Sequence, residues 1–215
     1  MTGIQARSLI SVLSPYALTT VYNVRTALGI PKDKLSDDLV YRLERLINAA
    51  TTSIETYCDR NFVQREHIEI YDGRGTDRFV PRHWPITDIV ELWLDSNSKF
   101  IDTNNLLDAD EYVIADDATT IELVDRLFPS ARYSVKIRYK SGFVGVPADL
   151  IQAADMYVEW FYRFNERGDI GRSTRSKGDE SINIEQGIPT IVIELIKKYK
   201  RFEFGGATPR SSINV

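Results

Sequence analysis

The sequence predicts an α+β fold: a helical bundle with helices from the N- and C-terminal parts of the chain, and a small antiparallel β-sheet inserted between the two helical blocks. Apolar residues recur every three or four positions from residue 36 to 58 and again from 147 to 164, which is the spacing of one helix face. From residue 68 to 140, apolar residues alternate with polar ones, as in strands with one solvated face. Because the helical period stops and then returns, the β region is expected to be an insertion.

Residues 1–62 are expected to form the N-terminal helices of the bundle. Thr19 or Thr20 can cap a short helix, and the stretch from Gly29 to Pro31 would end it. Ser36 is the expected N-cap of the longest helix, because two aspartates follow it where the helix dipole favours negative charge. The apolar face of this helix comprises Leu39, Leu43, Leu46, Ile47, Ala50, Ile54, Tyr57 and Cys58.

Residues 63–141 are expected to form the inserted antiparallel β region. Its short alternating runs are separated by turn residues, such as the Asp-Gly pair that follows Ile68 and Ile70. The last run alternates most regularly. It predicts one face with Val135, Ile137 and Tyr139 and an opposite, solvated face with Lys136, Arg138 and Lys140.

Residues 142–204 are expected to supply the C-terminal helices of the bundle. Two glycines and a proline separate the last strand from the next helix, a setting in which proteins often bind phosphate. A Walker loop requires a lysine and a serine or threonine after its last glycine, but Val146 and Pro147 stand here, and proline lacks a backbone amide. We interpret the stretch as a hinge in which the glycines reverse the chain and proline starts the helix.

The helix after this hinge carries an apolar and aromatic stripe, and a polar segment follows it. The stripe comprises Leu150, Ala154, Tyr157, Phe161 and Phe164, widened by Trp160 and Tyr162. Residues 165–187 are expected to be a mobile loop, because they are polar and contain several glycines. The bundle core is expected to join both blocks through Leu39, Leu43, Leu46, Ile54, Leu150, Tyr157, Phe161, Val192 and Leu195.

The C-terminal end is expected to be one more helix and a tail. Pro189 opens the helix and Gly205-Gly206 ends it. Residues 205–215 are expected to be a flexible tail, because their apolar content is too low for them to fold alone.

No catalytic, cofactor-binding or metal-ligating residues are expected. Cys58 is the single cysteine, which excludes an internal disulfide, and it is expected to be a small buried core residue. His67 and His83 lack the spacing of a metal site and are expected to be surface or turn histidines. No apolar run is long enough to span a bilayer, so no membrane partner is expected, and the protein is expected to act in a cytoplasm.

Charge is segregated along the chain, which predicts interfaces. The net charge of -4 argues against general nucleic-acid binding, since phosphate is bound mainly by Lys and Arg. Residues 102–125 are acidic without a single basic residue, whereas the C-terminal part is basic. Opposed charges of this kind can direct the docking of subunits or partners. The candidate interface residues are Arg167, Arg172, Arg175, Lys177, Lys197, Lys198, Lys200, Arg201, Pro209, Arg210, Ile213 and Asn214.

Two blocks of the sequence resemble bacteriophage head-to-tail connector proteins, also called adaptor or head-completion proteins. In the block Ala17–Phe62, the first helix ends in Leu-Gly-Ile and the second helix starts with Asp-Asp-Leu. The block itself ends in Arg-x-Phe. The block Val135–Arg163 has a strand, a Tyr-x-x-Gly turn, Val-Pro and a helix that ends in a Trp-Phe-Tyr cluster. The substantial β region between the blocks departs from the smallest members of that family.

The resemblance implies a non-enzymatic virion protein at the neck between head and tail, present in the host cytoplasm during assembly. It implies a homo-oligomeric, dodecameric ring that binds the portal protein, lengthens the DNA channel and is a platform for tail or stopper proteins. Genomic DNA would pass through without specific binding, which suits a net acidic subunit. The tail 205–215 could order on the portal by adding a strand to a sheet edge.

Two other classes of function stay open from the sequence. One is a small metal-dependent hydrolase that uses the carboxylates between Asp102 and Asp125, although no motif selects a pair of them. The other is a nucleic-acid-binding module that uses the basic stretch Lys197–Arg201, which a steep salt dependence of DNA affinity would indicate.

Overall fold

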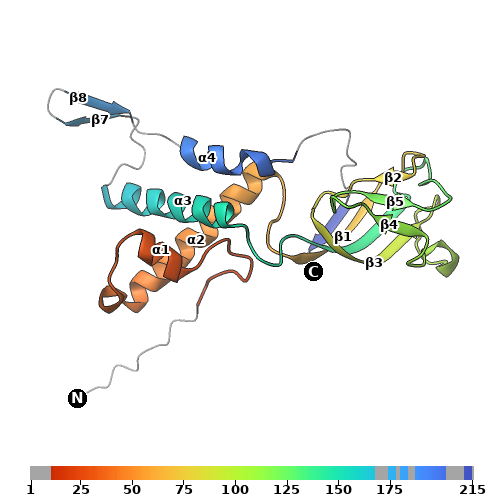
Figure 1. Ribbon diagram of the computed structural model, residues 1–215, viewed down its shortest axis with the longest axis horizontal. Helices are drawn as coiled ribbons and strands as arrows, with labels where there is room; N and C mark the ends of the chain where they lie inside the picture. Colours follow the sequence, from red (N-terminus) through yellow and green to blue (C-terminus); the bar gives the residue numbers. More distant parts are fainter. Residues whose placement is uncertain (1–10, 168–173, 178–179, 184–186, 202–210, 215) are drawn as a thin grey trace, which may run out of the picture. The chain divides into compact units, whose positions relative to one another are not determined.

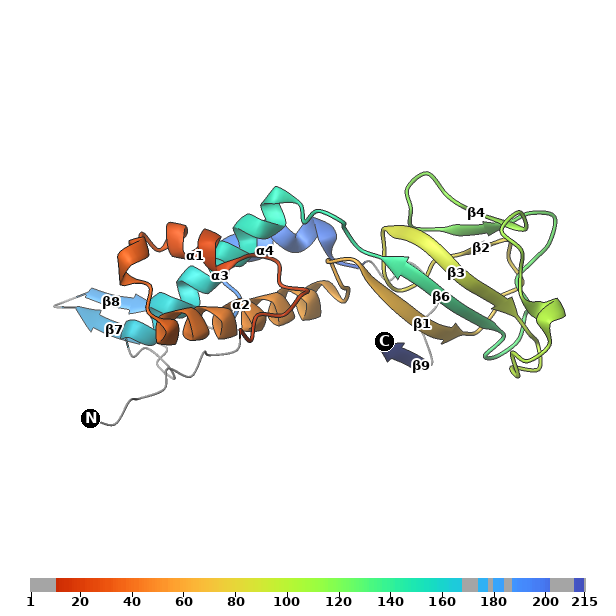
Figure 2. The same ribbon diagram turned by 90° about the horizontal axis from the view of Figure 1, so that it is seen from below.

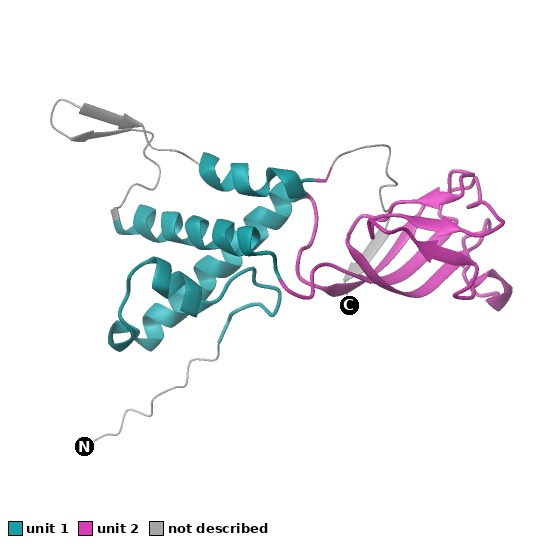
Figure 3. Cartoon of the chain, in the orientation of Figure 1, with its two compact units in different colours: residues 1–58, 146–200 teal, residues 59–145, 201–215 magenta. Residues whose placement is uncertain are grey.

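The chain folds into two compact units, each built from segments distant in sequence (Figure 3). The computed structural model describes residues 11–167, 174–177, 180–183, 187–201 and 211–214. Unit 1 comprises residues 1–58 and 146–200, and unit 2 comprises residues 59–145 and 201–215. The α+β class with an inserted antiparallel β region is confirmed.

Unit 1 is the helical unit (Figure 1). Its elements are α1 (Val21–Ala27), η1 (Lys32–Lys34), α2 (Asp37–Cys58), α3 (Ala148–Arg167), α4 (Thr190–Ile196) and η3 (Lys197–Tyr199), together with the hairpin strands β7 (Thr174–Lys177) and β8 (Glu180–Asn183). Helix α3 contacts α1, α2 and α4, so both helical blocks share one bundle. Two predicted N-caps are confirmed: the Thr20 hydroxyl accepts a hydrogen bond from the amide of Asn23, and the Ser36 hydroxyl accepts one from Leu39.

The core of unit 1 lies along the predicted helix faces. Fully or almost fully buried side chains include Leu43, Ile47, Ala50, Ile54, Leu150, Tyr157, Val192 and Ile196, whereas Leu39, Leu46, Phe161 and Leu195 are half-buried. Cys58 is buried, as predicted, and its thiol lies 3.7 Å from the carbonyl oxygen of Ile196.

A polar row on α2 holds the segment before α1. The carboxylate of Glu44 is buried and accepts hydrogen bonds from the Ser11 hydroxyl at 2.6 Å and the Val12 amide at 2.8 Å. One and two turns further along α2, Asn48 and Thr51 bond the backbone of the same segment. These residues lie beside the apolar face at the same helical spacing, so the periodicity of apolar residues did not reveal them.

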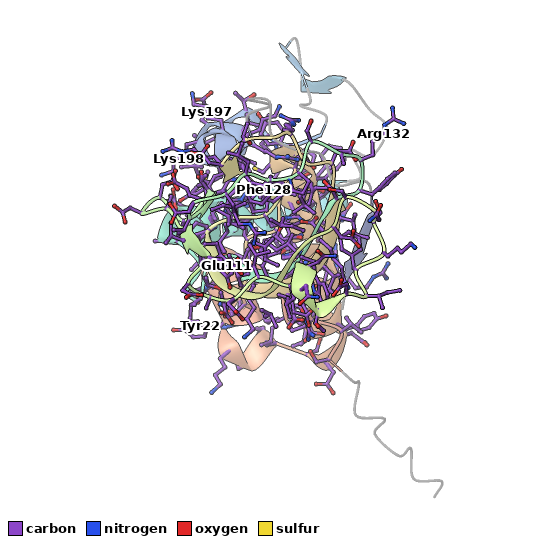
Figure 4. All side chains as sticks on the ribbon, turned by 90° about the vertical axis from the view of Figure 1, so that its right-hand side faces the viewer. Tyr22, Glu111, Phe128, Arg132, Lys197 and Lys198 are labelled. Carbon is purple, nitrogen blue, oxygen red and sulfur yellow. The ribbon has the colours of Figure 1, made fainter. Side chains whose placement is uncertain are left out.

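Unit 2 consists of two antiparallel sheets that share one hydrophobic core (Figure 2). The larger sheet has the order β3 (Ile86–Leu94), β6 (Val135–Ser141), β1 (Arg65–Tyr71), β9 (Ser211–Asn214). The smaller has the order β2 (Arg78–Phe79), β5 (Ile121–Leu123), β4 (Tyr112–Ile114), and a short helix, η2 (Thr103–Asn105), precedes β4. The core includes Tyr71, Leu92, Ile137, Ile121 and Phe128, the last labelled in Figure 4.

The glycine-rich stretch before α3 forms a close backbone contact in unit 2. Gly142 has a φ of +107°, and a Cβ there would lie 2.8 Å from backbone atoms of Phe62 and Val63. The amide of Phe143 donates to the carbonyl of Phe62, and Val63 and Phe143 form a parallel bridge. The first glycine is therefore required by the approach of two backbones. The interpretation of the stretch as a hinge stays a prediction.

Two segments differ from the prediction. Residues 165–187 were expected to be a mobile loop, but α3 continues to Arg167 and β7 pairs with β8 in an antiparallel hairpin. Residues 168–173, 178–179 and 184–186 of this range lie outside the described residues. The strands have few apolar residues, so hydrophobic alternation could not indicate them. Residues 205–215 were expected to be a flexible tail, but β9 pairs with β1 through backbone hydrogen bonds, which do not depend on apolar content.

Candidate interface surfaces

The basic residues at the end of unit 1 are largely engaged within the chain. Lys197 pairs with Glu194, and Lys198 lies 2.6 Å from a carboxylate oxygen of Asp149, at the start of α3. The hydroxyl of Tyr199 donates to the same carboxylate. Burial alone would raise the pKa of Asp149, but hydrogen bonds from Lys198 and Tyr199 hold this pKa below its ordinary value. The ammonium groups of Lys197 and Lys198 (labelled in Figure 4) are exposed but each has an acidic partner.

The other predicted interface residues are dispersed. Lys200 lies over the ring of Tyr57 at 4.9 Å, and Arg201, in unit 2, lies 3.4 Å from a carboxylate oxygen of Asp59. Arg167 ends α3, Arg175 and Lys177 lie on β7, and Ile213 and Asn214 lie on β9. Arg172, Pro209 and Arg210 fall outside the described residues. The proposed role of these residues in an interface stays a prediction.

Four acidic residues of the stretch 102–125 cap turns or form ion pairs. The Asp102 carboxylate accepts from the amide of Asn104, and the Asp117 carboxylate accepts from the amide and hydroxyl of Thr119, which hold the pKa of Asp117 below its ordinary value. Glu111 pairs with Arg126 at 2.6 Å and Glu122 with Arg78 at 3.2 Å. Within the part of the chain that the structure describes, no three His, Cys, Asp or Glu side chains are placed to hold a metal ion.

The solvated face of the larger sheet carries ion pairs across its strands. The guanidinium of Arg138 on β6 lies between Glu66 of β1 and Glu91 of β3, and Lys140 lies 3.1 Å from Asp88 of β3. The third basic residue, Lys136, lies over the ring of Trp93, 5.6 Å from its centre. Two of the three basic residues that the alternation predicted, Arg138 and Lys140, are therefore paired with carboxylates of neighbouring strands, which weakens this face as a phosphate-binding surface.

A buried polar cluster lies on the inner face of β1. His67 and Glu69 are 2% and 1% exposed, and His83, before β3, is 6% exposed. The imidazole rings of His67 and His83 stack with their centres 4.1 Å apart. The expectation of a surface or turn histidine is wrong for His67, because β1 turns its His67 face inward and its Ile68 and Ile70 face outward. His83 does lie in the bend before β3, but it is buried there and not at the surface.

Two tyrosines connect Glu69 to the backbone before β3. The hydroxyls of Tyr71 and Tyr139 donate to one carboxylate oxygen of Glu69 at 2.5 and 2.6 Å. The same hydroxyls accept hydrogen bonds from the amides of Arg82 and His83. Each tyrosine therefore both donates and accepts, and the cluster holds the segment at residues 82–83 against the sheet.

Burial keeps the two histidines neutral. Desolvation, and then the charges of Arg65 and Arg82, lower the pKa of His67 to about 4. Desolvation, followed by His67 and the nearby arginines, lowers the pKa of His83 to about 2. Nδ1 of His83 accepts from the amide of Asn61, so the proton of the neutral ring is on Nε2, which lies 3.8 Å from Glu69. Desolvation also raises the pKa of Glu69.

Helix α3 carries a row of stacked aromatic side chains. Trp160 stacks on Phe164 at 4.7 Å between ring centres, and Tyr157 stacks on Phe161 at 4.5 Å. Tyr157 is buried, whereas Trp160, Phe161 and Phe164 are half-buried. Half-buried aromatic side chains of this kind are enriched at protein interfaces. None of the described helices is both long and apolar enough to cross a membrane.

Comparison with known proteins places the fold and the family. Among solved structures, the chain is similar to a chain in the virion of a native gene transfer agent particle, with a TM-score of 0.60 and 19% identity over 90% of this chain and 95% of that chain. It is similar to a chain in the neck of the empty particle computed with C6 symmetry, with a TM-score of 0.60 and 19% identity over 93% and 98%. A chain in the neck of the native particle computed with C12 symmetry gives a TM-score of 0.52 and 20% identity over 89% and 98%.

At such identities the likeness concerns the fold, and it extends over nearly the full length of both chains. No curated protein matches the sequence. The model of the head completion protein family matches residues 17–202, which include both helical blocks and the inserted β region. The chain therefore belongs to the head completion protein family.

Proposed function

We propose that the protein is a structural head-to-tail adaptor that joins the neck of a phage-like virion as a homo-oligomeric ring. The observation that carries this proposal is the match of the head completion family over residues 17–202. The fold shared with chains from the neck of a gene transfer agent particle supports it. In this proposal the ring binds the portal protein, extends the DNA channel and provides a platform for tail or stopper proteins, and it performs no chemical step.

The surface chemistry of both units suits such a role. On the larger sheet, Arg138 pairs with Glu66 and Glu91 and Lys140 pairs with Asp88, and in the helical unit Lys197 and Lys198 have acidic partners. Pairing with carboxylates lowers the affinity of these cations for phosphate, which would help DNA to pass without tight binding. The half-buried aromatic surface of α3 is a candidate contact with a neighbouring subunit or with the portal.

The proposal is tested by the stoichiometry of the purified protein, alone and mixed with portal rings. We expect a closed ring of defined subunit number on the portal, measured by native mass spectrometry and electron microscopy. An adaptor can be monomeric before it meets its template, so a monomer in isolation does not refute the proposal. The stoichiometry of the mixture with portal rings is the decisive measurement. Portal rings that stay bare at saturating concentrations of the protein would refute the adaptor role.

The basic stretch is tested by substitution with a matched control. Lys197→Gln removes an exposed i,i+3 pair with Glu194, and Arg163→Gln removes an exposed i,i+4 pair with Glu159 in the same unit. Exposed pairs contribute little to stability, so both variants should stay folded. If the basic stretch binds the portal, only Lys197→Gln weakens the complex; equal affinities would remove this stretch from the interface.

A further inference from the structure

The larger sheet of unit 2 is completed by the C-terminal strand. Strand β1 pairs with β6 over seven residue pairs on one side and with β9 over four on the other. In the second pairing, Ile68 lies opposite Ile213 and Ile70 lies opposite Ser211, at positions on the outer face of the sheet. Without β9, the backbone edge from His67 to Ile70 would be an open sheet edge, which pairs readily with other chains.

The sequence of β9 contributes few side-chain contacts that would fix it to this edge. Its sequence, Ser-Ser-Ile-Asn, contains one apolar residue, so the pairing depends mainly on backbone hydrogen bonds. Strand β1 itself is held by its pairing with β6 along the opposite edge and by the buried polar cluster around Glu69 on its inner face. The site that accepts the strand is therefore built into unit 2, whereas the strand that fills it is short and terminal.

The connection to β9 starts from a fixed point. Arg201 is 13% exposed at its side chain and lies 3.4 Å from a carboxylate oxygen of Asp59, which also binds Arg82 at 2.7 Å. Residues 202–210 connect this point to Ser211, and ten backbone steps can reach at most about 34 Å. A connection of this length lets β9 pair with any acceptor edge within that distance, whether the edge belongs to its own chain or to an adjacent molecule.

We propose that the β1 edge is a strand-acceptor site which, in the assembled ring, takes residues 211–214 from a second copy of this chain. The fitting strand is known from the structure, because β9 itself pairs there in a defined register, and every copy carries the same four residues. The exchange conserves the backbone pairing and adds hydrogen bonds between subunits. Around a closed rotation the β1 edge of every subunit is covered by a strand of its neighbour. The inference rests on the proposed ring.

A mixing experiment distinguishes exchange from pairing within one chain. Full-length Ile68→Cys protein and tagged full-length Ile213→Cys protein are mixed, assembled and oxidised, since directly opposed positions on antiparallel strands have Cα separations that a disulfide accepts. A disulfide between the two proteins can form only by exchange. We expect about half of the Ile68→Cys chains to become linked in an equal mixture, since each acceptor meets either donor equally often.

The controls isolate the register and the native cysteine. Ile70→Cys replaces Ile68→Cys in the register control, because Ile70 lies opposite Ser211, two residues from Ile213, and should link poorly. A mixture of each variant with the unsubstituted protein measures any contribution from the buried Cys58. If the variant with both Ile68→Cys and Ile213→Cys forms the disulfide within one chain but the mixture gives no linked heterodimer, the exchange is overturned.

A second variant tests the same inference without cysteines. Ser212→Pro combined with Ile213→Pro removes two neighbouring amides, one of which faces β1 in any antiparallel pairing. We expect native mass spectrometry to show loss of rings while the far-ultraviolet circular dichroism of the full-length protein is retained. Rings that dissociate at an unchanged concentration would overturn the exchange. If the unsubstituted protein forms no ring with or without portal, the adaptor proposal itself fails; rings without linked heterodimers refute the exchange alone.

Discussion

Acidification should destabilise unit 2 through its two buried histidines. In the folded state the pKa of His67 is about 4 and that of His83 about 2, against an ordinary value of 6.5. As the pH falls below 6.5, the histidines of the unfolded chain therefore bind protons before those of the folded chain do. The free energy of unfolding keeps its full value above pH 6.5 and decreases as the pH falls from 6.5 towards the pKa values of the folded state. Linkage gives about 2 kcal/mol for each histidine at pH 5, or about 4 kcal/mol together.

Other groups of the cluster modify this loss. The raised pKa of Glu69 acts in the opposite direction, because the folded state takes up this proton before the unfolded state does as the pH falls. The nearby charges of Arg65 and Arg82 are constant over the range and favour the neutral imidazoles. The net decrease between pH 7.5 and pH 5 should therefore lie below the sum of the two histidine contributions.

Urea unfolding followed by tryptophan fluorescence measures the effect. Trp160 is the tryptophan of unit 1, so a Trp160→Phe background leaves Trp84 and Trp93 as reporters of unit 2. His67→Phe keeps a ring beside His83 and should reduce the pH dependence by about 2 kcal/mol. Asp116→Asn, at an exposed turn, is the control and should leave it unchanged. An unfolding free energy that is flat from pH 7.5 to 5, or equally steep in His67→Phe, would refute the reasoning.

Three further substitutions test the packing and backbone arguments by chemical or thermal unfolding. Gly142→Ala should destabilise the protein by at least about 1–2 kcal/mol, because the φ of Gly142 is +107° and a Cβ there would lie 2.8 Å from backbone atoms. Gly145→Ala is the control and should be tolerated, because a Cβ there would have nothing within 4 Å. Equal stability of the two variants would contradict the close contact. Ile137→Ala, at a fully buried site, should cost about 2–5 kcal/mol and Ile101→Ala, 79% exposed, less than about 0.5 kcal/mol. Ser36→Ala should cost about 1 kcal/mol through loss of its hydrogen bond to the start of α2, and an unchanged melting temperature would remove this cap.

For the candidate surfaces, the sequence predicts which residues are charged but not which of these charges are paired. The basic row on β6 is visible in the alternation, but its neutralisation depends on Glu66 and Glu91, which reach it from strands distant in sequence. The same holds for Lys198, whose partner Asp149 lies at the other end of the C-terminal block. Ion pairing is decided by proximity in space, so a count of charges along the chain overestimates the free basic surface.

The buried cluster of unit 2 shows why a strand pattern can be assigned to the wrong face. Ile68 and Ile70 alternate with His67, Glu69 and Tyr71, and a rule based on hydrophobicity favours the isoleucines as the inner residues. The structure buries the polar set, because Tyr139 from β6 and the backbone at residues 82–83 satisfy its hydrogen bonds. No local signal contains these partners.

The sequence by itself determined the helices, their caps and the existence of an inserted antiparallel region, because helical hydrogen bonds and caps join residues within about four positions of one another. Tertiary structure decided the phase of β1, the neutralisation of the basic rows and the pairing of the last strand, since β1 and β9 are joined by contacts between residues near 70 and residues near 213. Sheet pairing joins segments that are far apart in the chain, and which partner satisfies a backbone edge or a buried charge is known only when the chain has folded.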